Sequence, residues 1–386
     1  MSAVLFTTRA LGRLFYLSFF KRQDLRIQDR PRLPFCVKFF VLFPLVELFN
    51  WLCLMLDELV FPGCRRIPIR QPIFVIGPPR SGTTILHRVM ARDEEHLFCF
   101  RTWEIAFPSL LQKRALSVVG RLDRLTGGHL RASLLRREAE RFRPLHHIHE
   151  IGLFLPEEDD KLLAHVLASM DLAYFFPNGD FRRMAQFDVA VDPRDRRSIM
   201  SFYRRCLQRQ AYFKQGSRTF LSKNPIFSGK VAALLEQFPD CRIIYLVRNP
   251  LDVVPSAISL VRAIVRAVRG VELDADYDEQ AYEILRFFYT YPPDLLAALP
   301  EDRCMLLKYD DLIGQPDQVI RKIYAQFGLA LTPEFEERLA QEVAKMKRHE
   351  TRHEYALDRF SIKRDRIVAD LRPIFERFGF DTREVG

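Results

Sequence analysis

The chain has 386 residues, of which 48% are hydrophobic and 12% aromatic, and its formal net charge is +10. This composition excludes a disordered chain and suffices for one large α/β domain, alone or with an appendage. The charge favours anionic partners such as a nucleotide, an acidic substrate or lipid headgroups, although a solvated arginine-rich surface explains it equally well. No stretch interleaves basic and aromatic residues as nucleic-acid modules do, so we expect no nucleic-acid partner.

The cysteine pattern bears on the compartment. Seven cysteines are dispersed along the chain without C-x-x-C spacing. An odd, scattered set is typical of reduced thiols in a core, and not of zinc ligands or a disulfide framework. None of the asparagines begins an N-x-[ST] sequon. Both observations predict a cytoplasmic protein.

An apolar stretch, residues 35–63, follows a basic segment near the N-terminus. Its cleanest run, 39–56, is slightly shorter than the ~20 residues of a membrane span and contains Pro44, Glu47 and Asn50. A central charge costs about 2.5–3.5 kcal/mol, so a span is marginal. We predict that residues 1–70 form a separate helical segment lying in the membrane interface. A hairpin packed on the domain or on a partner, and a true span, are the alternatives.

The rest of the chain, 71–386, reads as one domain in which short apolar runs alternate with helical patterns. Alternation of this kind predicts an α/β fold, a three-layer P-loop-type domain with a central parallel sheet and ligands at the carboxyl ends of its strands. A helical, aromatic-rich insertion at about 110–215 is a candidate lining for an acceptor cleft, or simply core. The expected strands are 73–76, 219–222, 241–247 and 304–309, and the expected helices include 83–92, 228–238 and 250–268.

The stretch "GPPRSGTT", residues 77–84, resembles the phosphate loop G-x-x-x-x-G-K-[ST] but has Thr83 where the lysine belongs. Backbone N–H groups at a helix start attract phosphate. Because the lysine that holds a metal-bound triphosphate is missing, the loop suits a terminal 5′-phosphate or phosphosulfate better. A purely structural turn is the alternative. The candidate anion-binding residues are Arg80, Ser81, Gly82, Thr83 and Thr84.

A second candidate anion site is "RNPLDVVPS", residues 248–256. Arg248 lies at the end of an expected strand and Ser256 in the first turns of the helix that follows. The two side chains can converge on one anion, the arginine by its charge and fork and the serine by its hydroxyl. An ordinary ion pair between Arg248 and Asp252 is an equally good interpretation.

Together, the two motifs resemble those of the sulfotransferase superfamily, whose donor is 3′-phosphoadenosine-5′-phosphosulfate (PAPS). "GPPRSGTTIL" is similar to its 5′-phosphosulfate loop and "RNPLDVVPS" to its 3′-phosphate motif, while "LSKNPIFSGK" and "LLKYDDLIGQPDQVIRKIYAQFGL" resemble later elements. The resemblance covers about 72–329 and is strongest to bacterial proteins with P-R-S-G-T-T loops. It implies PAPS as the donor, no metal, and sulfuryl transfer to a hydroxyl or amine.

The resemblance also implies roles for single residues. Arg80 and Lys223 match the family's basic groups that stabilise charge on the leaving group, although Lys223 could be an ordinary surface ion pair. Glu104, in "FRTWEIAFPS", matches a catalytic glutamate that would serve as the base; its alternative is to cap a helix or bond Arg101. The runner-up base lies in "HHIHEIGLFLPEEDD", which contains His146, His147, His149, Glu150 and the acids 157–160. That cluster lacks the second partner group of a metal site, so no metal is expected.

An apolar insertion beside a membrane-seeking N-terminus favours a lipid or glycolipid acceptor, with the enzyme peripheral on the inner face of the cell membrane; a small-molecule acceptor is the other choice. Arg352 and Lys363 are candidates to close over the 3′-phosphate, with a solvated helix as the alternative. Two rival functions are a P-loop small-molecule kinase, which Thr83 argues against, and a non-catalytic membrane-associated scaffold, which has no use for two anion sites.

Overall fold

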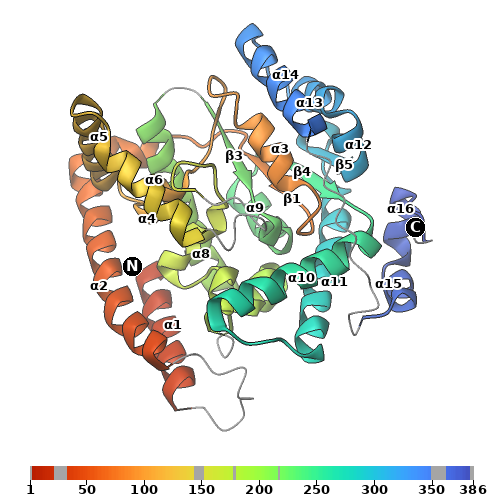
Figure 1. Ribbon diagram of the computed structural model, residues 1–386, viewed down its shortest axis with the longest axis horizontal. Helices are drawn as coiled ribbons and strands as arrows, with labels where there is room; N and C mark the ends of the chain where they lie inside the picture. The colour runs from red at the N-terminus through yellow and green to blue at the C-terminus, as the bar shows by residue number, and fades with distance from the viewer. Residues whose placement is uncertain are drawn as a thin grey trace.

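A computed structural model describes residues 2–20, 33–142, 152–176, 180–215, 218–348 and 362–382, to which every structural statement below refers. At its centre is a five-stranded parallel sheet with the strand order β2-β3-β1-β4-β5 (Figure 1). The four predicted strands are confirmed; the fifth is a two-residue edge strand, too short to show a pattern. The strands are β1 (Ile73–Ile76), β2 (Leu97–Phe98), β3 (Thr219–Lys223), β4 (Arg242–Val247) and β5 (Cys304–Lys308).

Alternate side chains of each strand enter two different cores. Ile73 and Val75 of β1 pack with α3 (Thr83–Met90), α13 (Pro316–Gln326) and α14 (Pro333–Arg348) on one face. Phe74 and Ile76 pack on the other face, with helices α8 (Pro193–Lys214), α9 (Val231–Gln237), α10 (Pro250–Arg269) and α11 (Ala275–Leu296). A strand places successive side chains on opposite faces, so the predicted three-layer α/β arrangement is confirmed.

The register aligns the carboxyl ends of the central strands. Val75 pairs with Lys223 of β3, and Ile76 of the same strand pairs with Tyr245 of β4. On the far side of β4, Val247 pairs with Lys308. The loops after β1, β3, β4 and β5 therefore meet at one edge of the sheet, the edge at which parallel α/β folds bind ligands.

The remaining elements cover the ends and flanks of the sheet. The described part of the predicted insertion is mostly helical, but residues 152–158 form turns and an isolated bridge between Pro156 and Arg101. The helix expected at 228–238 is a 3-10 turn followed by α9. The other α-helices are α1 (Ser2–Phe19), α2 (Leu33–Val60), α4 (Thr102–Ala106), α5 (Leu110–Leu125), α6 (His129–Phe142), α7 (Phe187–Ala190), α12 (Tyr309–Gly314), α15 (Arg364–Asp370) and α16 (Arg372–Phe378). The 3-10 segments are η2 (Pro62–Arg66), η3 (Asp159–Val166), η4 (Met170–Tyr174), η5 (Asp180–Gln186), η6 (Pro225–Lys230) and η7 (Glu301–Arg303).

The N-terminal helices pack on the domain. α1 contacts α8 and α2 contacts α5, and Phe6 and Leu54 belong to the same core as β1. Within the described residues, α2 is the one helix long and apolar enough to cross a membrane, a weak criterion because it rests on length and composition alone. The inward-facing sides of α1 and α2 thus pack on the domain, as the alternative of a packed hairpin predicts. A domain boundary near residue 70 stays a prediction.

Candidate active site

The loop between β1 and α3 needs both of its glycines. Gly77 has φ +144°, and a Cβ there would lie 2.0 Å from the carbonyl oxygen of Leu246 in β4. Gly82 has φ +86°, and a Cβ there would lie 2.7 Å from the ring of Tyr309 at the start of α12. A residue with a side chain rarely adopts such backbone conformations, and at these two positions its Cβ would also collide with the neighbouring atoms. The loop is thereby held against β4 and α12.

The start of α3 offers unpaired backbone donors. Gly82 is the N-cap residue and no side chain caps the helix, unlike α10, where the Asn249 side chain accepts from the N–H of Leu251. The first N–H groups of a helix have no partner within it and carry its positive dipole end. Thr83 is buried and Thr84 partly exposed beside them. These features fit an anion at this position.

The two predicted anion motifs are in direct contact. The Nε of Arg80, in the first loop, donates a hydrogen bond of 3.0 Å to the Oγ of Ser256 on α10. Arg80 has φ +70°, the left-handed region that a residue with a side chain rarely adopts. The two motifs therefore meet at the sheet edge, as expected. Ser256, which the sequence predicts to converge with Arg248 on one anion, is hydrogen-bonded to Arg80.

Arg248 forms the ion pair with Asp252 that the alternative interpretation of this motif predicts. Its Nε donates to Asp252 over 3.2 Å, and its guanidinium lies 4.4 Å from the centre of the Tyr309 ring. The hydroxyl of Tyr289 donates a hydrogen bond of 2.8 Å to the backbone carbonyl of Arg248. Since an ion pair between partly exposed groups contributes little stability, Arg248 can exchange Asp252 for a bound phosphate at small cost. Tyr309 contacts both motifs, by way of Gly82 and Arg248.

Lys223 ends β3 with its side chain buried, and its Nζ donates to Glu158 over 2.7 Å. This pair is not the ordinary surface ion pair considered above, because the lysine is almost fully enclosed. Glu158 belongs to a run of four acids, each of which has its own partner. Glu157 pairs with Lys161 at 2.9 Å, Asp159 accepts from Tyr203 and from Ser222 at 2.8 Å, and Asp160 accepts from Lys230 and from Ser169 at 2.6 Å.

His87, on α3, is a buried neighbour of Lys223 that the sequence analysis did not single out. Burial, helped by the positive charge of Lys223, lowers the pKa of its imidazole to about 3. His87 is therefore neutral in the folded protein at any ordinary pH. His87 lies one helical turn after Thr83, which is also buried. This spacing was the sequence signal that could have placed His87 on the inner face of α3.

Glu104 makes the contacts of a helix-capping residue, the alternative to its role as the base. Its carboxylate is 0% exposed and caps α4 by accepting from the backbone N–H of Arg101 at 2.8 Å. It also accepts from Gln210 at 2.8 Å and pairs with Lys214 of α8 at 2.6 Å. A carboxylate with this many partners stabilises the local fold. Whether it also serves as the base stays a prediction.

Several candidates lie outside the described residues: His146, His147, His149 and Glu150, and Arg352 near the C-terminus. Lys363 is described; it is the exposed N-cap residue of α15. No disulfide joins any of the seven cysteines, all of which lie in the described part of the chain, as predicted. Burial raises the pKa of Cys99 to about 12.

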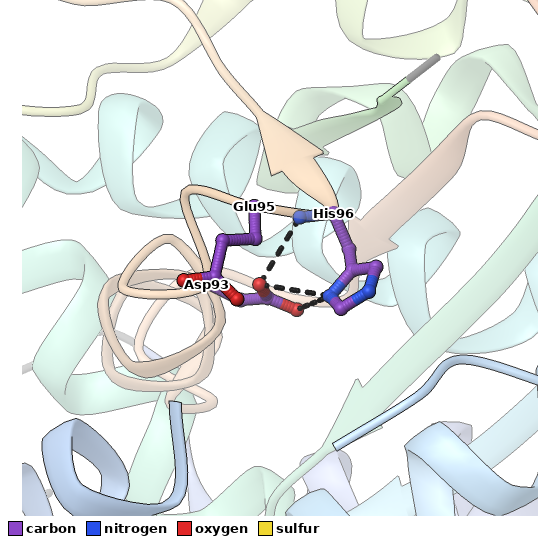
Figure 2. Close-up of side chains that lie close together, drawn as sticks. All are labelled: Asp93, Glu95 and His96. Atoms are coloured by element: carbon purple, nitrogen blue, oxygen red, sulfur yellow. Dashed lines mark hydrogen bonds and ion pairs between the residues drawn. The ribbon is translucent and has the colours of Figure 1, made fainter. Parts of the chain in front are cut away.

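Within the described residues, Asp93, Glu95 and His96 place three potential metal-ligand atoms close together (Figure 2). Asp93 already accepts from the backbone N–H of His96 at 3.1 Å and from Tyr324 at 2.7 Å, and its carboxylate lies 3.1 Å from the His96 ring. Glu95 accepts from Thr332 at 2.8 Å. The cluster therefore closes the turn between α3 and β2, and nothing in it calls for an ion.

Comparisons with known proteins identify the family of this chain. A model of the sulfotransferase family matches residues 72–333. The omega-hydroxy-beta-dihydromenaquinone-9 sulfotransferase Stf3 of Mycobacterium bovis is 28% identical over 80% of this chain and 75% of its own, and the M. tuberculosis protein of that name gives the same figures.

Two crystal structures share the fold. Sulfotransferase STF1 of M. tuberculosis has a TM-score of 0.67 at 19% identity, covering 95% of this chain and 91% of that one. Sulfotransferase STF9 of M. avium has a TM-score of 0.65 at 21% identity, covering 86% and 82%. The family match does not favour the kinase alternative. This chain belongs to the sulfotransferase family, and it is a sulfotransferase enzyme.

Proposed function

We propose that this enzyme takes its sulfuryl group from PAPS and transfers it to a hydroxyl group of a lipid. The observation that carries the donor assignment is the hydrogen bond between Arg80 and Ser256. It links the loop suited to a 5′-phosphosulfate with the motif suited to a 3′-phosphate, so one nucleotide can engage both. The uncapped start of α3 and the exchangeable pair of Arg248 and Asp252 support the same assignment.

We assign the charge-stabilising roles to Arg80 and Lys223. PAPS supplies a sulfuryl group whose bond to the bridging oxygen breaks as the acceptor oxygen forms its bond to sulfur. Negative charge then develops on the departing 3′,5′-bisphosphate, and cations held in place before reaction stabilise it most effectively. Lys223 is held by Glu158 and by its burial. Arg80 is held by Ser256.

The acceptor hydroxyl must lose its proton to a base, and Glu158 is better suited to this than Glu104. The Glu158 side chain is 21% exposed and contacts Lys223, whereas Glu104 is fully enclosed and engaged by three partners. A base must come within hydrogen-bond reach of the proton it removes. We therefore propose that Glu158, from the runner-up cluster, takes the proton while Lys223 remains charged, and we keep Glu104 as the rival to be tested beside it.

Two observations support a lipid acceptor over a soluble small molecule. The relative Stf3 is named for a sulfotransferase reaction on omega-hydroxy-beta-dihydromenaquinone-9. Helix α2 turns a continuous apolar side outward, which suits work at a membrane surface. Since no disulfide joins the described cysteines, we propose a peripheral location on the cytoplasmic face of the cell membrane. The absence of a nucleic-acid partner stays a prediction.

The donor assignment is tested by calorimetry in EDTA with adenosine 3′,5′-bisphosphate, 5′-AMP and ATP. Tight metal-free binding of the bisphosphate, lost in Arg248→Ala, is the expected result. Failure to bind it, with ATP binding restored by Mg²⁺, would refute the donor. The acceptor is tested separately by incubating the enzyme with radiolabelled PAPS and either a membrane lipid extract or soluble sugars and proteins. Label recovered only in the soluble acceptors would refute the lipid acceptor.

A further inference from the structure

The polarity of helix α2 is reversed relative to an ordinary surface helix. Its buried positions include Glu47, Asn50 and Asp57. Its exposed side is apolar apart from Lys38, and Leu59 is 79% exposed. The exposed large apolar side chains of α2 are Leu33, Val37, Val41, Leu42, Leu45, Val46, Leu48, Phe49, Leu52, Met55, Leu56, Leu59 and Val60. A helix facing water has the opposite pattern, so this side is built for an apolar environment.

The buried polar residues of α2 fasten it to the domain. Glu47 pairs with His165 of η3 at 2.9 Å. Asn50 accepts from Gln112 of α5 at 2.8 Å. Asp57 accepts from the backbone N–H of Leu110 and pairs with Arg209 of α8 at 3.0 Å.

Moving α2 alone across a bilayer would strip these groups of their partners and leave them in hydrocarbon, which is costly. Glu47 and Asn50, which make the sequence a marginal span, therefore point away from the exposed side. The helix remains docked on the protein and presents only its apolar side.

The helices that pack next to α2 also carry exposed apolar side chains. α5 packs on α2 and α6 packs on α5, and α1, α2, α5 and α6 occupy one flank of the molecule, at the left of Figure 1. We call the exposed apolar side chains of α2, α5 and α6 the apolar flank. Besides those of α2, it contains Leu116, Val118, Val119, Leu122 and Leu125 of α5 and Leu130, Leu134 and Leu135 of α6. Many exposed large apolar side chains on helices that pack together mark an interaction surface.

Positive charges accompany this flank. Arg121 and Arg124 on α5 and Arg131, Arg136 and Arg137 on α6 are exposed. The acid among them on α5, Asp123, accepts from the backbone N–H groups of Leu130 and Arg131 at the start of α6, so its charge is used within the protein. Apolar side chains next to exposed arginines complement a bilayer with anionic headgroups. A second copy of this chain, docked by the same surface, would bring two positively charged surfaces together.

We propose that the apolar flank binds a bilayer containing anionic phospholipids, with α2 lying in the plane of the interface and not crossing it. The purpose of this membrane binding rests on the lipid acceptor of the proposed function. The binding surface itself is inferred only from the contacts and charges given above. Bound in this way, the enzyme would lie at the surface of the membrane in which its proposed acceptor is dissolved.

The test is flotation of the full chain, without donor or acceptor, on vesicles of phosphatidylcholine alone and with phosphatidylglycerol. We expect stronger binding to the anionic vesicles, and loss of binding in the triple variant Leu48→Asp, Met55→Asp and Leu59→Asp. Val189→Asp is the matched control, since Val189 is 64% exposed on α7 and its change should leave binding intact. Arg121→Gln with Arg124→Gln should weaken the anionic preference by about 30-fold, at roughly 1 kcal/mol per arginine. Circular dichroism of each variant verifies folding.

Three results would overturn the proposal. One is equal binding of the triple variant and the wild type. Another is resistance of the membrane-bound protein to an alkaline carbonate wash, which would indicate a spanning helix. The third is absence of vesicle binding with a concentration-dependent dimer in sedimentation, which would assign the flank to a second copy. A protein that binds vesicles but sulfates only soluble acceptors would refute the lipid acceptor and leave the flank assignment standing, so the two failures are distinguishable.

Discussion

Arg80 and Ser256 lie 176 positions apart in the chain and are joined by a hydrogen bond of 3.0 Å from Nε to Oγ. The bond connects the loop after β1 with the helix after β4, and these two strands are neighbours in the sheet. A single contact thus couples the two halves of the proposed donor site. Its removal should weaken nucleotide binding more than the loss of one surface contact would.

Arg80→Ala is expected to weaken the binding of adenosine 3′,5′-bisphosphate by about 10- to 100-fold, since a hydrogen bond to a charged group contributes roughly 1.5–3 kcal/mol. Ser256→Ala, which removes a neutral hydroxyl, should have a smaller effect. Calorimetry in EDTA measures both. Arg321→Ala is the control, because Arg321 is an exposed arginine of α13 that pairs with Asp317 and Glu336. Unchanged affinity in Arg80→Ala would contradict the assignment of this arginine to the donor site.

Glu158→Gln and Glu104→Gln separate the two candidate bases. Loss of a general base typically costs 10²–10⁴ in rate, so Glu158→Gln should lower kcat to that extent while bisphosphate binding persists. Glu104→Gln should keep most of kcat but lower the free energy of unfolding by roughly 1–3 kcal/mol, because the buried network with Gln210 and Lys214 loses its charge. Steady-state kinetics and urea unfolding of the same preparations measure the two effects. A large loss of kcat in Glu104→Gln alone would restore Glu104 as the base.

The parts of this site that were predictable from the sequence are those that depend on local patterns. "IFVI" followed by Gly77 marks a strand and a tight loop, and "RIIYLV" before Arg248 marks another, so two loops at one sheet edge could be expected. The pairing of Lys223 with Glu158 could not, because the two residues are 65 positions apart and come together only when the acidic run docks on β3. No periodicity reports such a contact.

The side of α2 that faces solvent could not be predicted from the sequence either. A sequence with Glu47 and Asn50 in an apolar stretch looks like a marginal membrane span, since both residues count against insertion. The structure places both on the inner side, with His165 and Gln112 as partners. Those partners lie in distant segments, so the exposed side could be identified as apolar, apart from Lys38, only once the fold was known.

Gly77→Ala tests the packing of the phosphate loop. The new methyl group would lie 2.0 Å from the carbonyl oxygen of Leu246, a backbone atom that cannot step aside cheaply, and φ +144° is strained for alanine. We expect a loss of more than about 3 kcal/mol in the free energy of unfolding, measured by urea denaturation. Gly314→Ala is the matched control: a Cβ there meets nothing within 4 Å, and Gly314 ends α12. Equal stability of the two variants would show that the loop does not need a glycine at position 77.

His87 makes the stability of the enzyme sensitive to acid. Its pKa is about 3 in the folded protein, against 6.5 as the ordinary value. Below pH 6.5 the unfolded chain therefore binds a proton that the folded chain does not, so this residue's contribution to stability is complete above pH 6.5 and declines as the pH falls towards 3. At pH 5 the decline is about 2 kcal/mol, at 1.36 kcal/mol per pH unit.

His87→Gln should remove this dependence. Urea unfolding at pH 7 and pH 5 is expected to show that the wild type loses about 2 kcal/mol more than the variant over this interval. Asp159 acts in the opposite direction, because burial raises its pKa to about 7 and the folded chain then gains stability as the pH falls. Asp159 is present in both proteins, so its effect cancels in the difference. Equal losses in the two proteins would mean that His87 takes up a proton in the folded state, and its place as a neutral neighbour of Lys223 would have to be abandoned.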